Sequence, residues 1–372
     1  MNTLQKIKTL GTAANYDTVC GSPRSTKIAN DSLTDTVSSF IYKSRSENYD
    51  CRLFKVLMTN KCKHDCRYCA NRCSRQKNLT EFEPDELADV FQDLRRKGLV
   101  NGLFLSSGVC GDSEKTAEKM IKAVEIIRQK YFFTGYVHFK ILPGVSRDLV
   151  KRAGEIADRL SINIEAPNKE FLSEISSTKD MKNDILKRQR WIKEQNITGG
   201  QTTQLIVGSA GESDWDILKT VDHEVKEFSL RRFYFSAFSP VKNTPFENKE
   251  QTPLQREKRL YNVEFMLREY GFDFRKFKEI LNDKDNLPNI DPKIALANET
   301  IESPVDINEA SYNELLQVPG IGMKTAAKII VERKRNRIMK YEHLHKIGTA
   351  VERAKPYIKV NGMTQRRLGD WG

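Results

Sequence analysis

Three cysteines lie close together in the stretch KCKHDCRYCANRC, which runs from residue 61 to residue 73. Cys62, Cys66 and Cys69 follow a C-x3-C-x2-C spacing, so one short loop carries three thiols. Iron-sulfur cubanes are normally held by four cysteine thiolates. A loop with three would leave one iron of such a cluster free to take an outside ligand.

A zinc site is the alternative, because Cys73 or His64 could complete a tetrahedral set with the same three cysteines. Zinc modules usually pair two C-x2-C knuckles, and the rest of the sequence holds no second one. A disulfide framework fits less well, because seven cysteines cannot all pair. The cluster is the preferred interpretation.

The cysteine spacing, with the aromatic Tyr68 just before the last cysteine, resembles the signature of the radical S-adenosylmethionine (SAM) superfamily. In that family SAM chelates the fourth iron of the cluster. The resemblance implies that one electron, from a donor such as a flavodoxin or ferredoxin, cleaves SAM to a 5′-deoxyadenosyl radical. This radical then abstracts hydrogen from an unactivated carbon.

Six apolar segments alternate with segments of helical periodicity after residue 51, and they must position this loop. The first, RLFKVLMTN, leads straight into the cysteines. The others cover residues 102–108, 136–144, 159–167, 202–211 and 231–240. Such alternation predicts an α/β fold with parallel strands and right-handed crossovers. Six units fit the partial (β/α)6 TIM-like barrel that the resemblance implies, with chemistry at the C-terminal ends of the strands.

The resemblance also implies SAM contacts after the second and fourth strands. The family usually carries Gly-Gly-Glu after the second strand, whereas this chain has Ser106-Ser107-Gly108 and lacks the carboxylate. A plain turn rich in small residues is an equal alternative there. Asn163 and Glu165 share one face of the fourth strand, where the family places groups that bind the ribose.

In the family the fifth and sixth strands flank the adenine. The resemblance therefore implies that Gly208, Ser236 and Phe238 lie near the cofactor. Arg188 and Arg190 could reach the SAM carboxylate, but a solvated face is the preferred interpretation for so basic a helix.

A second motif lies near the C-terminus, in ASYNELLQVPGIGMKTAAKIIVERKRNR. Ser311 and Glu314 form a capping box at a helix start, and Pro319-Gly320-Ile321-Gly322 predicts a tight turn between two helices. The segment resembles a helix-hairpin-helix, an all-α module whose backbone meets DNA phosphates. The implied nucleic-acid contacts are Gly320, Gly322, Lys324, Thr325, Arg333, Lys334 and Arg335.

The charge of the chain agrees with a nucleic-acid partner. It carries 62 Lys and Arg against 50 Asp and Glu, a formal net charge of +12. From residue 324 onward, 13 Lys and Arg stand against 4 Asp and Glu, so most of the excess lies in the last 49 residues, which include the second half of this motif. A helical hairpin that contacts protein, with a solvated basic tail, is the alternative.

We expect four parts: an N-terminal extension of a short helix and irregular chain (1–50), the barrel (51–245), a helical segment and linker (246–295) and the helix-hairpin-helix module (296–372). No apolar run approaches the ~20 residues of a membrane span. The N-terminal residues are too polar for a signal peptide, so we expect a cytoplasmic protein without a membrane partner.

The combination resembles bacterial radical SAM proteins assigned to DNA modification or repair. One rival hypothesis is RNA modification, such as tRNA methylthiolation, although Cys20, Cys51, Cys73 and Cys110 supply no compact triad for a further cluster. Another is a DNA-binding iron-sulfur protein without enzymatic activity.

Overall fold

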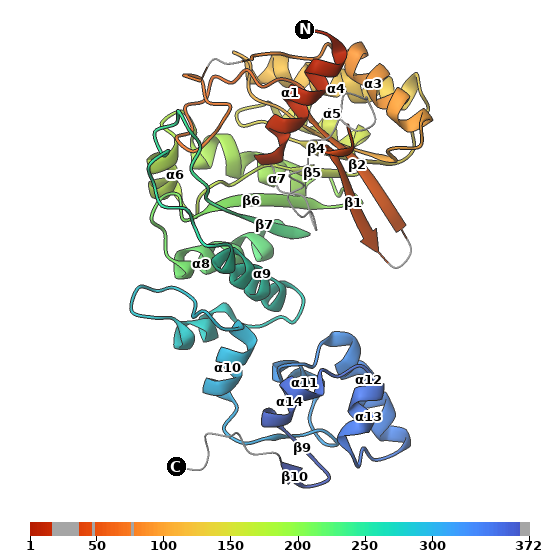
Figure 1. Ribbon diagram of the computed structural model, residues 1–372, viewed down its shortest axis with the longest axis vertical. Coiled ribbons are helices and arrows are strands. Elements are labelled where there is room, and N and C mark those ends of the chain that lie inside the picture. Colours follow the sequence, from red (N-terminus) through yellow and green to blue (C-terminus); the bar gives the residue numbers. More distant parts are fainter. Residues whose placement is uncertain (17–36, 47–48, 76–77, 365–372) are drawn as a thin grey trace. The chain divides into compact units, whose positions relative to one another are not determined.

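The computed structural model describes residues 1–16, 37–46, 49–75 and 78–364, which form two compact units (Figure 1). Unit 1 comprises residues 1–212 and 220–253, and unit 2 comprises residues 213–219 and 254–372. The border near residue 253 lies inside the segment 246–295, which the sequence predicts as a helical linker.

Unit 1 is built on a seven-stranded sheet in which the strands follow one another in chain order. The first strand runs antiparallel to the second, and the remaining six are parallel neighbours. The curled sheet of six parallel strands confirms the expected partial barrel. The strands are β1 (Ile41–Ser46), β2 (Tyr49–Leu57), β3 (Gly102–Ser106), β4 (Tyr136–Lys140), β5 (Arg159–Ser161), β6 (Gln201–Val207) and β7 (Arg232–Ala237).

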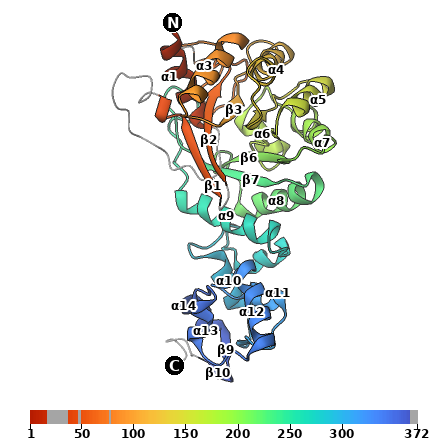
Figure 2. The same cartoon turned by 90° about the vertical axis from the view of Figure 1, so that its right-hand side faces the viewer.

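Helices connect the parallel strands and pack against one another along the outer face of the sheet (Figure 2). All residues of β3 and β6 are buried, as expected for parallel strands covered on both faces. The helices are α3 (Pro84–Arg96), α4 (Ser113–Gln129), α5 (Arg147–Ile156), α6 (Lys169–Ile175), the π-helix η2 (Met181–Leu186), α7 (Lys187–Lys193) and α8 (Asp214–Phe228).

The N-terminal region is more ordered than the sequence predicts. Helix α1 (Thr3–Ala13) packs against β2 and is followed by the short helix η1 (Ala14–Tyr16). Strand β1 lies in a stretch expected to be irregular, and it covers the free edge of β2 by antiparallel pairing. Its sequence, IYKSRS, is too polar to signal a strand. Residues 17–36 of the expected extension lie outside the described residues.

Unit 2 begins with a helical segment and ends with two helical hairpins. The segment contains α9 (Leu254–Arg268), η3 (Phe274–Ile280) and α10 (Pro292–Thr300). The hairpins are α11 (Tyr312–Gln317) with α12 (Met323–Arg335), and α13 (Tyr341–Lys346) with α14 (Val351–Ala354) and η4 (Lys355–Tyr357). The expected capping box is confirmed, since Ser311 and Glu314 each accept from the other's backbone N–H.

A small three-stranded sheet accompanies these helices, although an all-α module was expected. It consists of β8 (Val305–Asp306), β9 (Ile358–Val360) and β10 (Met363–Thr364). The strands are two or three residues long, too short to leave a periodic pattern in the sequence. Within the part of the chain that the structure describes, none of the helices has the length and apolar character needed to span a membrane.

Candidate functional site

The cysteine loop begins where β2 ends and runs beside the exit of β3. The N–H groups of Met58 and Lys63 donate to the carbonyls of Ser106 and Val109 at 2.8 and 2.7 Å. Gly108 makes this approach possible, because a Cβ there would lie 2.4 Å from the carbonyl oxygen of Lys61. The spacing of the cysteines is therefore fixed against a neighbouring strand.

A second anchor fastens the loop to the chain after α6. The carboxylate of Asp65 accepts hydrogen bonds from the hydroxyls of Ser176, Ser177 and Thr178 at 2.8, 2.6 and 3.0 Å. Partial burial alone would raise the Asp65 pKa, but these donors outweigh it and hold the pKa well below its usual value. The Arg67 N–H adds a bond to the Ile175 carbonyl at 2.8 Å. The loop is thus held from both sides.

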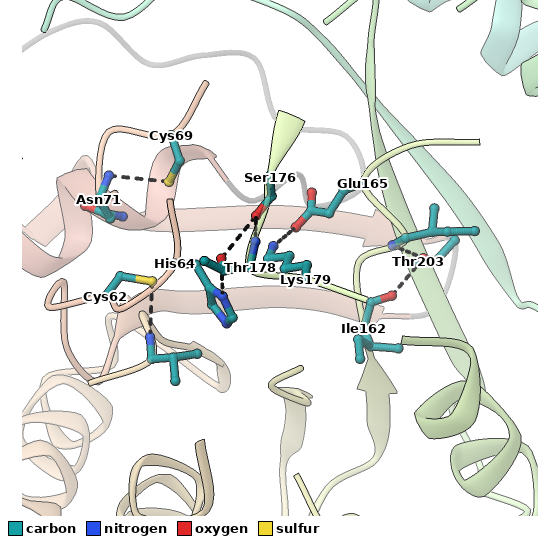
Figure 3. Close-up of polar contacts among 12 residues, drawn as sticks. Cys62, His64, Cys69, Asn71, Ile162, Glu165, Ser176, Thr178, Lys179 and Thr203 are labelled. Carbon is teal, nitrogen blue, oxygen red and sulfur yellow. Dashed lines mark hydrogen bonds and ion pairs between the residues drawn. The ribbon is translucent and has the colours of Figure 1, made fainter. Parts of the chain in front are cut away.

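The three cysteines line a cavity of about 130 Å³ at the C-terminal ends of the strands. Two backbone amides face their sulfur atoms: Asn71 N–H donates to Cys69 Sγ at 3.3 Å and Val109 N–H to Cys62 Sγ at 3.5 Å (Figure 3). Other residues that line it include His64, Tyr68, Ser106, Ser107, Gly108, Asn163, Glu165, Lys179, Gln204 and Ile206.

A buried ion pair lies in the same cavity. Lys179 Nζ is 3.0 Å from Glu165 Oε1, and each side chain is 8% exposed (Figure 3). Burial alone would lower the Lys179 pKa, but the neighbouring Cys66 and Glu165 outweigh it and raise the pKa. Glu165 adopts a left-handed backbone conformation (φ 66°), held by an isolated bridge to Leu205. Because the pair is buried and the backbone of Glu165 is held by this bridge, the Lys179 ammonium is kept beside the cysteines.

Several buried polar atoms of this cavity have no hydrogen-bond partner among the described residues. They are His64 Nε2, Ser107 Oγ and Glu165 Oε2. The other ring nitrogen of His64, Nδ1, pairs with Thr178 Oγ1 at 3.0 Å. Burial and the charge of Lys179 lower the His64 pKa to about 4, so the imidazole is neutral. Unpaired buried polar atoms are costly, and a polar ligand would satisfy them.

The hairpin turn of unit 2 has a tightly packed backbone. Gly320 has φ 87°, and a Cβ there would lie 2.5 Å from the carbonyl oxygen of Ala350 in the second hairpin. The Ala350 N–H donates to the Gly320 carbonyl at 3.1 Å. Gly322 is the N-cap of α12 and makes no side-chain cap hydrogen bond.

The expected nucleic-acid contacts of α12 fall into two groups. Arg333 is committed to the fold, because its Nη1 donates to the carbonyls of Ala310 and Ile307 at 2.7 and 3.2 Å. Lys324, Lys334 and Arg335 are exposed. Thr325 is partly buried and donates to the Gly348 carbonyl at 3.3 Å.

Comparison with known protein families finds a match for the cysteine loop with its barrel and another for the helical hairpins. The profile of the Radical SAM superfamily matches residues 56–223, and that of a helix-hairpin-helix motif matches residues 301–354. The chain contains a radical SAM domain. The superfamily consists of enzymes that use a [4Fe-4S] cluster and SAM, and the cysteine loop lies inside the matched region.

Individual relatives cover only parts of the chain. Biotin synthase from Leptospira biflexa is 27% identical over 195 residues, which are 52% of this chain and 53% of that protein. The Holliday junction branch migration complex subunit RuvA from Corynebacterium glutamicum is 35% identical over 69 residues, 18% of this chain and 34% of that protein. The chain thus spans about half the length of biotin synthase and a third of RuvA.

Solved structures with similar folds include two proteins of 14% identity. Methylornithine synthase (PylB) matches with a TM-score of 0.49 over 57% of this chain and 60% of that chain. The FeFe-hydrogenase maturase HydG from Carboxydothermus hydrogenoformans matches with a TM-score of 0.47 over 57% and 50%.

The radical SAM domain fits the cluster and SAM on its own residues. A cluster would take Cys62, Cys66 and Cys69, and the amides that face Cys62 and Cys69 are the usual partners of cluster-bound sulfur. Among the described residues, no group of three or more His, Cys, Asp or Glu side chains is arranged to hold a single metal ion.

Most of the expected SAM contacts line the cavity. Tyr68, Ser106, Ser107, Gly108, Asn163 and Glu165 all do so. Burial, with the nearby Glu165 charge, raises the pKa of Tyr68 well above its usual value. Asn163 and Glu165 do not lie on a continuous strand as expected, because β5 ends at Ser161. The left-handed conformation of Glu165 brings its carboxylate to the cavity instead.

The expected adenine contacts stay a prediction. Gly208, Ser236 and Phe238 are not among the residues that line the cavity, which instead receives Gln204 and Ile206 from β6. The Gly208 N–H donates to Glu212, and Phe238 packs edge-on against Phe246 with the ring centroids 6.0 Å apart.

Arg188 has a structural role, which corrects both sequence interpretations of this side chain. It is buried, its Nε donates to the Val145 carbonyl at 2.7 Å and its Nη1 donates to the Asn183 carbonyl. The polar run from Ser176 to Lys179 was missed, because it reads as an ordinary turn. The run lies between α6 and the π-helix η2, and its sequence alone does not mark it as part of a site.

The remaining cysteines are scattered. Cys51 is buried in a cluster with Leu53 and Phe104, Cys73 is exposed and Cys110 is partly buried. Cys20 lies outside the described residues.

Proposed function

We propose that this chain is a radical SAM enzyme that cleaves SAM reductively and modifies or repairs DNA. The observation that carries the enzymatic part is the cavity in which Cys62, Cys66 and Cys69 meet unpaired buried polar atoms and the Lys179–Glu165 pair. When bound, the cluster and SAM would supply a radical able to take hydrogen from an unactivated carbon.

The residues of the cavity have separate roles in this proposal. Lys179 Nζ, held beside the cysteines by Glu165, is suited to bind the SAM carboxylate. Glu165 Oε2 and Asn163 would accept from or donate to the ribose hydroxyls. Ser107 Oγ and the backbone at Gly108 would take the place of the missing Gly-Gly-Glu run at the SAM amino group. Buried walls from β6 would exclude water.

The DNA part of the proposal rests on the helix-hairpin-helix match, the likeness of one segment to RuvA and the exposed cations of α12. Phosphate contacts of this kind fix position without reading sequence. A base inside a duplex is hidden from a radical in a buried cavity, so we expect a flipped base or a single-stranded region.

An electron donor is also required. Lys63 and Arg67 are exposed on the cysteine loop and Arg67 follows a cluster ligand directly in the chain. Positive side chains at this place favour an acidic donor such as a flavodoxin or ferredoxin.

The test uses the full chain, purified and reconstituted under anaerobic conditions. After reduction and addition of SAM, we expect 5′-deoxyadenosine, formed faster when a DNA duplex with an unpaired base is present. RNA of the same sequence serves as the matched control. Zinc in place of iron, or a reduced cluster that leaves SAM intact, would contradict the enzymatic proposal.

The same experiment separates the rival hypotheses. Faster turnover with RNA than with DNA would favour RNA modification. DNA binding without SAM cleavage would favour an iron-sulfur protein with a structural or redox-sensing cluster.

A further inference from the structure

A second cavity, of about 310 Å³, lies in unit 2 beside α11. Its walls come from three segments: residues 270–276, α10 and α11. Among the described residues that line it, none belongs to the hairpin turn 318–322 or to α12. The first two segments also lie outside the matched motif 301–354. The phosphate contacts that the helix-hairpin-helix resemblance implies therefore do not account for this cavity.

The inner surface of the cavity is apolar and partly aromatic. Ala297 and Leu316 are buried in the hydrophobic core of unit 2. The rings of Tyr270 and Phe272 are only partly buried, and their centroids lie 5.9 Å apart at an interplanar angle of 51°. A small cavity with an apolar floor and two accessible rings is suited to a flat aromatic ligand that stacks on one of them.

Two side-chain amides add polar groups to this cavity. Asn313 and Gln317 are four residues apart on α11, so they share one face of the helix, and both line the cavity. Neither side chain has a hydrogen-bond partner among the described residues. A side-chain amide carries an acceptor and a donor side by side, the pattern that pairs with the edge of adenine. The cavity thus holds hydrogen-bonding groups that the fold does not use.

The charge at the cavity favours a nucleotide over a neutral aromatic ligand. Asp273 is the one carboxylate among the described residues that line it, and Arg275 neutralises this charge, with its Nη2 2.6 Å from Asp273 Oδ2. Lys276 also lines the cavity, is exposed and has no ion-pair partner among the described residues. The charge that remains is positive, and a phosphate next to a bound base would meet it.

We propose that this cavity binds one unpaired base of a DNA strand, adenine in preference to thymine, with the base stacked on Tyr270 and its edge paired with Gln317. The proposal rests on the proposed function and deepens it. Phosphate contacts hold a strand without reading it, whereas a base in this cavity gives the enzyme a preference among sequences. A base in a duplex is stacked and paired, so the cavity fills only from a single-stranded region or with a flipped base.

The experiment measures the affinity of the full-length protein for fluorescent oligothymidine and for the same strand with one central adenine. We expect about tenfold tighter binding of the strand with adenine. Gln317→Leu removes the amide and keeps the size of the side chain, so it should abolish this preference and leave the affinity for oligothymidine unchanged. Gln255→Leu is the matched control, because Gln255 lies on α9 and does not line the cavity. It should keep the wild-type preference.

Two substitutions at Tyr270 test the stacking. Tyr270→Leu should weaken binding of the strand with adenine about tenfold, and Tyr270→Phe should keep the wild-type affinity. A 2-aminopurine in place of the central adenine reports the contact directly, because its fluorescence is quenched when it stacks on a ring. The quenching should be lost in Tyr270→Leu and kept in Tyr270→Phe.

The phosphate is tested separately at Lys276. Lys276→Gln should lower the affinity for both strands equally and reduce the salt slope by about 0.7, without changing the preference for adenine. Lys258→Gln is the control, because Lys258 is exposed on α9 outside the cavity. It should change the salt slope less than Lys276→Gln does.

The outcomes separate this proposal from the proposed function. If the wild-type protein binds both strands equally, the cavity reads no base and this proposal is overturned, while DNA binding by the hairpins stands. If Gln317→Leu and Tyr270→Leu lower only the melting temperature and keep the preference for adenine, the two residues are structural and the proposal is likewise overturned. Binding of neither strand at low salt, or tighter binding of the matching RNA, would overturn the DNA part of the proposed function as well.

Discussion

The two units prepare polar groups for ligands in opposite ways. In the radical SAM domain the groups that face the cavity are buried and cross-linked, as in the Lys179–Glu165 pair and the Asp65 anchor. In the hairpins most cations are exposed, and the backbone is the rigid part. A radical must meet one atom in a dry site, whereas phosphates of any sequence need only charge and amides. Single substitutions in the cavity of unit 1 should therefore abolish SAM cleavage or leave it intact. Single substitutions in the hairpins of unit 2 should each lower DNA affinity by a small amount.

Removal of a cluster ligand should have the largest effect. Cys66→Ala leaves two thiolates in a loop built for three, so we expect loss of iron and sulfide and no 5′-deoxyadenosine. DNA affinity should stay the same if the units work separately. Cys73→Ala is the matched control, because Cys73 is exposed and only its backbone bonds the loop, through its N–H to the His64 carbonyl at 2.9 Å. If both variants lost the same amount of iron and sulfide, the three-cysteine site would be contradicted.

The buried ion pair should show the next largest effect. Lys179→Met leaves the Glu165 carboxylate buried without its partner, which costs about 3 to 5 kcal/mol of folding free energy. Denaturant unfolding of the transition that belongs to unit 1 measures this loss. The double variant Lys179→Met with Glu165→Met should recover much of the stability but bind no SAM. A double variant as unstable as the sum of the single ones would show that the two residues act independently.

The close approach of the loop to β3 can be tested at one glycine. Gly108→Ala places a Cβ 2.4 Å from the Lys61 carbonyl oxygen, so the cysteine loop must shift. We expect the free energy of unfolding to fall by about 1 to 3 kcal/mol and the iron content after reconstitution to be lower. Ser107→Ala, one residue earlier, removes a hydroxyl that has no partner among the described residues and should change SAM affinity rather than stability.

Features that depend on residues close together in the chain could be predicted from the sequence, whereas features that depend on residues far apart could not. Cysteine spacing, the strand and helix rhythm and the Ser311–Glu314 capping box are local, and the structure bears out the barrel and the capped helix. Lys179 was not predictable, because its place beside Cys66 depends on a fold-back of more than a hundred residues and on a π-helix. Gly208 and Phe238 directly follow β6 and β7 and were expected near the cofactor from that position, but they are not among the residues that line the cavity.

The exposed cations of α12 should give the smallest and most graded effect, and they separate a DNA contact from a structural one. Replacing Lys334 and Arg335 with glutamine removes two charges that the fold does not need, so affinity for DNA should fall several-fold at physiological salt. The salt slope should decrease by about 1 to 2. Arg333→Gln breaks the bonds to the Ala310 and Ile307 carbonyls instead, so it should lower the melting temperature of unit 2. The reverse pattern, with a large salt effect at Arg333 and none at its two neighbours, would mean that the hairpin approaches DNA through a different face of α12.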